Sequence, residues 1–191
     1  MTFSGVYLCS SSPRRHAILT EFNVNFKTVQ NHLEDEPERW SFESPLAYAA
    51  RLAHLKSTVS AASIDGWVLT ADTVVTYQNE VLGKPMNEDD AFKMLSTLLG
   101  KRHQVISVCV LSNHRKKAIM YCIDYAMVYF KSVPNKDLRH YIMSKTPLDK
   151  AGAYGIQDNP SFLTHYSGDY FTVMGLPIKR LLKLFSSCGI V

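Results

Sequence analysis

The sequence of 191 residues has little of several features that mark specialised classes of protein. It contains four cysteines, at positions 9, 109, 122 and 188, and no two of them form a CxxC pair. Such isolated cysteines argue against a disulfide framework or a zinc site, so we expect reduced core residues in a cytoplasmic protein. No apolar run approaches membrane-spanning length, and the N-terminus lacks the basic and apolar regions of a signal peptide, so we expect no membrane partner.

Charge of one sign is also scarce. The net charge is +4, and no run of five like charges occurs. A mild positive charge fits an anionic ligand but not a nucleic-acid tract, so no stable nucleic-acid partner is expected. The sequence has no internal repeat, low-complexity segment or linker, and 46% of its residues are hydrophobic. These properties predict a single globular domain over residues 1–191.

The hydrophobic pattern predicts strands and helices that alternate along the chain. Strands are expected at 5–9, 24–29, 67–77, 103–112 and 118–130, and FLTHYS with YFTVM, within 162–174, reads as a strand pair. Helices are expected at 13–22, at 45–61, between Asn87 and Gly100, at 134–145 and between Leu176 and Gly189. The inner stripe of the helix at 45–61 is read as Tyr48, Leu52, Leu55 and Val59. This order indicates an α/β fold with a mixed, twisted sheet and flanking helices.

The stretch SSSPRR, residues 10–15, lies between the first strand and the first helix. The free N–H groups of a helix start, the Ser10 hydroxyl and the guanidinium groups of Arg14 and Arg15 can all bind phosphate oxygens. The segment therefore predicts a polyphosphate pocket. The alternative is a serine cap followed by two solvent-facing arginines.

An aspartate, Asp72, lies within the apolar strand LTADTVV. Burying a carboxylate there is costly unless it binds a metal, a positive partner or a substrate. The alternative is a strand-end aspartate that caps a turn. In the acidic loop HLEDEPE, one of Glu34, Asp35, Glu36 and Glu38 could join Asp72 in holding a divalent ion, although solvated charges are the ordinary alternative.

Three further segments extend this pattern. In LGKP, Gly83 would let the backbone approach a ligand, and Lys84 would supply a point charge, unless it is an ordinary turn lysine. Lys56 interrupts an amphipathic helix, where a surface lysine is the default. Gln157 in AYGIQ could read a base edge, although structural amides are common in loops. Together the signals predict a cationic, metal-assisted site for a triphosphate.

The motifs carry a resemblance. LCSSSPRRHAIL resembles the opening of the Maf family, the septum-formation-inhibitor-like nucleotide pyrophosphatases. RLAHLK, ADTVV, LGKP, GKRHQV, DKAGAYGIQ and GDYFTVMGLP follow in the family's order and cover nearly the whole chain. The resemblance implies a fold similar to that of the inosine-triphosphate pyrophosphatases, elongated and two-lobed with a central cleft.

The resemblance also implies hydrolysis of nucleoside triphosphates to monophosphate and pyrophosphate, with Mg²⁺ or Mn²⁺ as cofactor. It implies that Asp72 is the proton acceptor and acts with Lys56 and Lys84. Metal ligands would be Asp72 with Glu34 or Glu36. Substrate contacts would be made by Ser10, Arg14, Arg15, Thr73 and Gln157.

The AYGIQ version of the late motif implies the branch that acts on dTTP and UTP, with modified pyrimidine nucleotides as further candidates. Asp158 follows Gln157 where the family usually has glycine, and this departure bears on the base pocket. The implied cellular role is cleaning of the nucleotide pool. The family's historical name supports a second hypothesis, a non-catalytic nucleotide or nucleic-acid binder that regulates cell division. A homodimer is left open.

Overall fold

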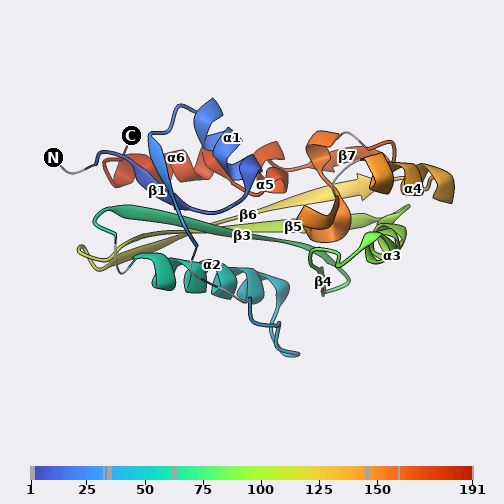
Figure 1. Cartoon of the computed structure of the whole chain (residues 1–191), viewed down its shortest axis with the longest axis horizontal. Helices are drawn as coiled ribbons and strands as arrows, with labels where there is room; N and C mark the ends of the chain where they lie inside the picture. The colour runs from blue at the N-terminus through green and yellow to red at the C-terminus, as the bar shows by residue number, and fades with distance from the viewer. Residues whose placement is uncertain are drawn as a thin grey trace. The chain divides into compact units, whose positions relative to one another are not determined.

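The computed structural model describes residues 3–31, 33, 36–61, 64–144, 147–158 and 160–190. It is a mixed α/β fold built on a seven-stranded sheet with the strand order β2-β1-β3-β5-β6-β7, in which β4 pairs with β3 (Figure 1). The strands are β1 (Val6–Cys9), β2 (Phe26–Val29), β3 (Trp67–Tyr77), β4 (Glu80–Leu82), β5 (Arg102–Asn113), β6 (Ala118–Phe130) and β7 (Leu163–Ser167). The helices are α1 (Pro13–Glu21), α2 (Pro45–Ala61), α3 (Glu88–Leu98), α4 (Asn135–Ser144), α5 (Tyr170–Met174) and α6 (Ile178–Ser187).

The sheet combines parallel and antiparallel pairs, as predicted. β1 runs parallel to both β2 and β3, with Val6 opposite Phe26 and Trp67. β4 runs antiparallel to β3, and β7 runs antiparallel to β6. Gln78 and Asn79 have positive φ angles of 50° and 67°, which form the tight turn between β3 and β4.

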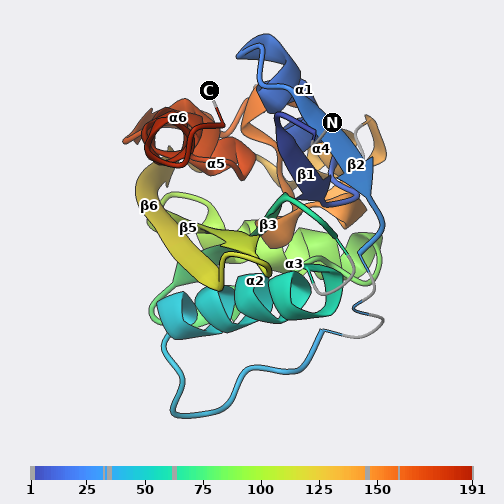
Figure 2. The same ribbon diagram turned by 90° about the vertical axis from the view of Figure 1, so that its left-hand side faces the viewer.

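The chain divides into two compact units. The first comprises residues 1–72, 107–124 and 175–191. In it the sheet lies between α2 on one face and α1 with α6 on the other (Figures 1 and 2). Its fully buried side chains include Leu8, Ile18, Leu52, Leu111 and Phe185. No described helix is both long enough and apolar enough to cross a bilayer.

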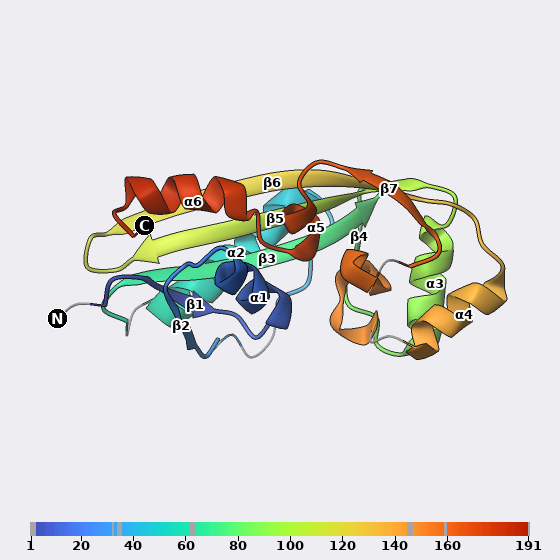
Figure 3. The ribbon, with the colours of Figure 1, turned by 90° about the horizontal axis from the view of Figure 1, so that it is seen from above.

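The second unit comprises residues 73–106 and 125–174. Figure 3 shows α3 and α4 side by side in it. Three short 3-10 turns, at Pro147–Asp149, Ala151–Ala153 and Ile156–Asp158, follow α4. The core of this unit is formed by side chains that include Leu95, Val128, Leu138, Tyr154 and Phe162. Asn87 caps α3 as predicted, since its side chain accepts a hydrogen bond from the Asp90 backbone N–H.

The expected strand pair FLTHYS–YFTVM is wrong. FLTHYS supplies β7, which pairs with β6, but YFTVM forms α5. Gly168 has a φ of +106°, and the Thr172 N–H donates to the Asp169 carbonyl at 3.1 Å. The chain therefore leaves the strand at the glycine and begins a helical turn, although its β-branched and aromatic residues favour a strand.

The predicted inner stripe of α2 is confirmed at Leu52 but wrong at Val59. Val59 is 41% exposed and Tyr48 and Leu55 are only partly buried, whereas Leu52 lies on a buried face with Ala49, Ala53, Lys56, Ser57 and Ser60. This spacing follows the helical period, but three of the six side chains are polar. The serines have partners: Ser57 Oγ lies 2.7 Å from Ser112 Oγ, and Ser60 Oγ lies 2.9 Å from Cys9 Sγ. Small residues and paired hydroxyls make up most of this face, so a search for large apolar residues identified only Leu52 on it.

Candidate active site

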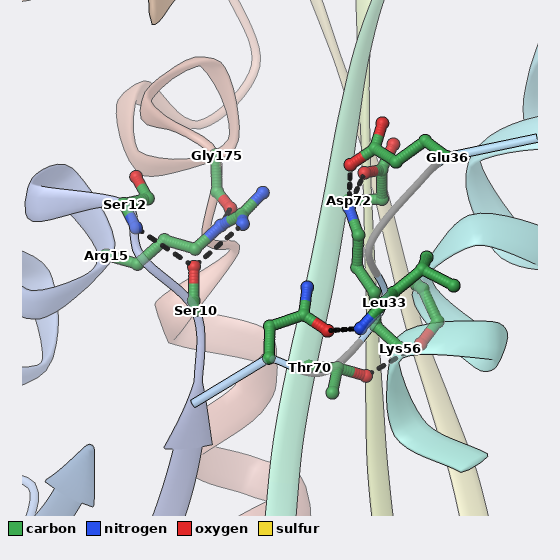
Figure 4. A network of polar contacts seen from close by, with 11 residues as sticks. Ser10, Ser12, Arg15, Leu33, Glu36, Lys56, Thr70, Asp72 and Gly175 are labelled. Atoms are coloured by element: carbon green, nitrogen blue, oxygen red, sulfur yellow. Dashed lines mark hydrogen bonds and ion pairs between the residues drawn. The ribbon is translucent and has the colours of Figure 1, made fainter. Parts of the chain in front are cut away.

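Lys56 bridges two carboxylates in the first unit. Its Nζ donates to Asp72 Oδ1 at 2.6 Å and lies 2.7 Å from Glu36 Oε1 (Figure 4). Lys56 and Asp72 are each only 7% exposed, whereas Glu36 is exposed. The default expectation of a surface lysine is therefore wrong for Lys56. Asp72 is not a turn cap, because it lies inside β3 and β-structure continues beyond it.

The neighbouring backbone determines this geometry. The Thr70 hydroxyl donates to the Ala53 carbonyl at 2.7 Å, and both groups are buried. Ala53 precedes Lys56 by one helical turn, and Thr70 precedes Asp72 by two positions, on the same face of β3. The hydrogen bond therefore joins helix and strand in the register that brings Lys56 to Asp72.

Burial and neighbouring charges act on the pKa values of this pair. Burial raises the pKa of the Asp72 carboxyl, and the negative Glu36 adds to the rise, while Lys56 and Arg15 oppose it. Burial disfavours the charge on Lys56, but the carboxylates of Asp72 and Glu36 outweigh burial and raise its pKa. Lys56 therefore stays charged at neutral pH. Asp72 holds a proton more tightly than an ordinary carboxylate, which makes it a stronger base.

Arg15 of the SSSPRR segment reaches toward Gly175 and Ser10 (Figure 4). Its Nε donates to the Gly175 carbonyl at 2.9 Å, and its Nη1 donates to Ser10 Oγ at 3.1 Å. Burial lowers the pKa of Arg15 and the Asp72 charge opposes this change, so the two side chains interact electrostatically. The alternative of two solvent-facing arginines is therefore wrong for Arg15. Ser10 is 6% exposed and also accepts from the Ser12 N–H at 3.3 Å.

The acidic loop contributes Glu36 to this cluster. Glu34, the other predicted metal ligand of this loop, lies outside the described residues. The choice between Glu34 and Glu36 therefore stays a prediction. Among the described residues no group of three or more histidine, cysteine, aspartate or glutamate side chains could hold a metal ion. The oxygens of Asp72 and Glu36 nevertheless converge on one cationic point. Two such oxygens fit a hard divalent ion that takes its other ligands from phosphates and water.

Three predicted site residues, Thr73, Lys84 and Gln157, belong to the second unit. Lys84 and Gln157 are exposed, and Thr73 directly follows Asp72 in β3. Their membership of one site with Asp72 stays a prediction.

Within the second unit two of the motifs do meet. The Gly152 N–H of DKAGAYGIQ donates to the Gly83 carbonyl of LGKP at 2.9 Å.

Gly175 was not among the predicted site residues. Its carbonyl holds Arg15, 160 positions away along the chain. A backbone acceptor leaves no local pattern in the sequence, and the only available signal was the position of Gly175 in the motif GDYFTVMGLP.

Comparisons of the sequence with known proteins point to one family. A family model described as Maf-like protein matches residues 5–188. A dTTP/UTP pyrophosphatase from Pectobacterium atrosepticum is 40% identical over 185 residues, which cover 95% of this chain and 92% of the relative. A dTTP/UTP pyrophosphatase from Syntrophomonas wolfei is 38% identical over 184 residues, which cover 95% and 96%. Among solved structures, a HAM1 protein from Coxiella burnetii matches with a TM-score of 0.52 and 15% identity, covering 95% of this chain and 98% of that one. The last match shows likeness of fold alone.

Proposed function

The chain belongs to the Maf-like protein family, and on that premise we propose that it hydrolyses nucleoside triphosphates, preferring dTTP and UTP, to the monophosphate and pyrophosphate. Relatives described as dTTP/UTP pyrophosphatases, about 40% identical over most of the chain, support this choice of substrate. The observation that carries the proposal is the contact of Lys56 with both Asp72 and Glu36, together with a partly buried Arg15 that Asp72 influences electrostatically.

Asp72 and Glu36 are the residues that would hold Mg²⁺ or Mn²⁺. When bound, such an ion withdraws charge from phosphate oxygens and lowers the pKa of a water molecule in its shell. The fit rests on two carboxylate oxygens, each within 2.7 Å of the same ammonium nitrogen.

The side chains of this chain then have separable tasks. Asp72 accepts the proton of the water that attacks the α-phosphorus, as a carboxylate held in β3 by its contact with Lys56. The cationic groups neutralise the charge that develops on the pyrophosphate leaving group; we assign this task to Arg14, Arg15, Lys56 and Lys84. Thr73 and Gln157 act in substrate choice.

Arg15 is prepared for phosphate binding before substrate arrives. Gly175 and Ser10 hold the guanidinium at 2.9 and 3.1 Å, so its orientation is set by the fold. A group oriented in advance stabilises developing charge without reorganising during the reaction. We therefore assign to Ser10 the task of orienting Arg15 in addition to contacting substrate.

Substrate, product and metal can be tested together. The purified protein is incubated with dTTP, UTP, 7-methyl-GTP or ATP and Mg²⁺, and pyrophosphate and orthophosphate are assayed separately. We expect pyrophosphate from dTTP and UTP, less from the purines, and none after chelation until Mg²⁺ or Mn²⁺ is restored. Orthophosphate instead of pyrophosphate would place cleavage at the wrong bond. Nucleotide binding without any release would favour the non-catalytic regulator.

The proposed cellular role is removal of non-standard pyrimidine nucleotides in the cytoplasm. The four cysteines are free, three of them buried, which fits a reducing compartment.

A further inference from the structure

The turn that carries Gln157 is closed by one tyrosine from α4. The Tyr141 hydroxyl accepts a hydrogen bond from the Gly155 N–H at 3.0 Å and donates one to Asp158 Oδ2 at 2.9 Å. The Asp158 N–H donates to the Gly155 carbonyl at 3.1 Å. Both ends of the turn are therefore attached to a single side chain, and Gln157 lies between them.

The turn is packed tightly around Gly155. A Cβ atom added there would lie 2.6 Å from Gln157 Nε2 and 2.9 Å from Asp158 Oδ2. The amide of Gln157 and the carboxylate of Asp158 therefore fold back over the α-carbon of Gly155. The packing at Gly155 limits where the Gln157 amide can lie. Gln157 is nevertheless exposed, so its amide can still reach a ligand.

Tyr141 is itself held firmly. It is 6% exposed, and its ring lies edge-on against Phe162 with centroids 5.0 Å apart. Burial raises the pKa of its phenol, and the nearby Asp158 charge raises it further. The hydroxyl therefore stays protonated and remains a donor to Asp158 over the physiological range.

The orientation of an amide decides which base edge it can bind. Thymine and uracil present an N3–H donor beside an O4 acceptor, whereas cytosine presents an N3 acceptor beside an N4 donor. A glutamine amide has one acceptor and one donor group, so each orientation suits only one of these patterns. An amide free to rotate by 180° would accept both.

We infer that Tyr141 and Asp158 are positioning residues that hold the Gln157 amide in the orientation selecting 4-keto pyrimidines over 4-amino pyrimidines. The inference rests on the proposed function, because it requires that the chain hydrolyses pyrimidine nucleotides and that Gln157 contacts the base. Tyr141 makes two hydrogen bonds to the turn and Asp158 accepts one of them, so loss of Tyr141 has the larger effect.

The test compares kcat/KM for dTTP with kcat/KM for dCTP. We expect Tyr141→Phe to reduce this ratio about tenfold. The main cause should be a higher kcat/KM for dCTP. Asp158→Ala should reduce it by less. Asp158→Asn keeps an oxygen that accepts from Tyr141 and should retain the ratio of the unmodified protein.

Tyr129→Phe is the matched control in the second unit. The Tyr129 ring stacks on His165, and in the described structure its hydroxyl makes no hydrogen bond, so its ratio should not change. Thermal unfolding of each variant shows whether it is folded at the assay temperature. Unfolded protein lowers kcat/KM for both nucleotides equally, so the ratio reports selectivity alone.

The outcomes separate the two proposals. Absence of pyrophosphate release by the unmodified protein from any pyrimidine nucleotide overturns the proposed function. If the protein is active but Gln157→Ala leaves the ratio within twofold, Gln157 does not read the base and this inference fails alone. It also fails if Tyr141→Phe retains the ratio, or if Asp158→Asn loses as much as Tyr141→Phe.

Discussion

The Thr70 hydroxyl lies 2.7 Å from the Ala53 carbonyl oxygen, and this buried hydrogen bond joins β3 to α2 beside the proposed catalytic pair. Lys56 and Asp72 follow on the same helix and strand and meet at 2.6 Å. The distance between a helical lysine and a strand aspartate thus depends on a threonine whose hydroxyl bonds to neither of them.

Thr70→Val should lower stability and activity together. Valine has a similar shape but removes the hydroxyl that bonds the Ala53 carbonyl, and the loss of one buried hydrogen bond costs about 0.5–1.5 kcal/mol. Thr58→Val is the control, on helix α2 like Ala53, because the Thr58 side chain is exposed and donates to the Leu55 carbonyl. In urea unfolding, the control should change the free energy of unfolding by less than about 0.5 kcal/mol. Equal effects in the two variants would contradict a special role for Thr70.

Asp72→Asn should reduce kcat for dTTP by a factor on the order of 10² or more, because the amide cannot accept a proton. Lys56 keeps Glu36 as a partner, so the variant should remain folded in a thermal melt. Asp65→Asn makes the same chemical change at a half-exposed carboxylate that pairs with Arg115. That control should retain activity, and near-normal turnover in Asp72→Asn would remove Asp72 from the mechanism.

Lys56→Met should lower the free energy of unfolding by about 3 kcal/mol, because it leaves the buried Asp72 carboxylate without its close cationic partner. Adding Asp72→Asn removes the unpaired charge. In urea unfolding the double variant should therefore be more stable than Lys56→Met alone. A double variant whose loss equals the sum of the two single losses would mean that the two side chains do not interact.

Acidification should destabilise the fold through His103. The imidazole is 1% exposed, and burial lowers its pKa to about 4 from the ordinary 6.5. Between these values the unfolded chain binds a proton that the native state refuses, so stability falls as pH drops. The full loss is about 3 kcal/mol.

Urea unfolding measured from pH 7.5 down to pH 4 checks this dependence. His103→Gln should flatten it by removing the titrating group, even if the substitution lowers stability at every pH by losing the contact with Tyr154, at 2.8 Å. The same substitution at exposed His114 should leave the slope in place. An unchanged slope in His103→Gln would assign the effect to other groups.

Gly152 and Gly83, which share a backbone hydrogen bond, should differ in how much stability an alanine substitution costs. Gly152 has a φ of +69°, and an added Cβ would lie 3.0 Å from the Val75 side chain, so Gly152→Ala should cost about 1–3 kcal/mol. A Cβ at Gly83 would have no atom within 4 Å among the described residues, so Gly83→Ala should leave the melting temperature unchanged. If a ligand approaches the Gly83 backbone, Gly83→Ala should still raise KM for dTTP. An unchanged KM would contradict that close approach.

Several features depended only on neighbouring residues and could be predicted from the sequence. Pro13 begins α1, Asn87 caps α3, and the β-branched run at 67–77 forms β3. The early alternation of strands and helices indicated a mixed α/β sheet. These predictions were confirmed because capping groups, proline and hydrophobic period act within one or two turns of the chain.

The sequence by itself determined the order of elements, the family motifs and the candidate residues. Only the tertiary structure decided that polar residues share the buried face of α2, that Lys56 contacts both Asp72 and Glu36, and that Arg15 is held by Gly175. Each decision depends on partners supplied by another element, because burying a charge or hydroxyl is tolerable only where a distant segment provides its counter-charge or hydrogen bond.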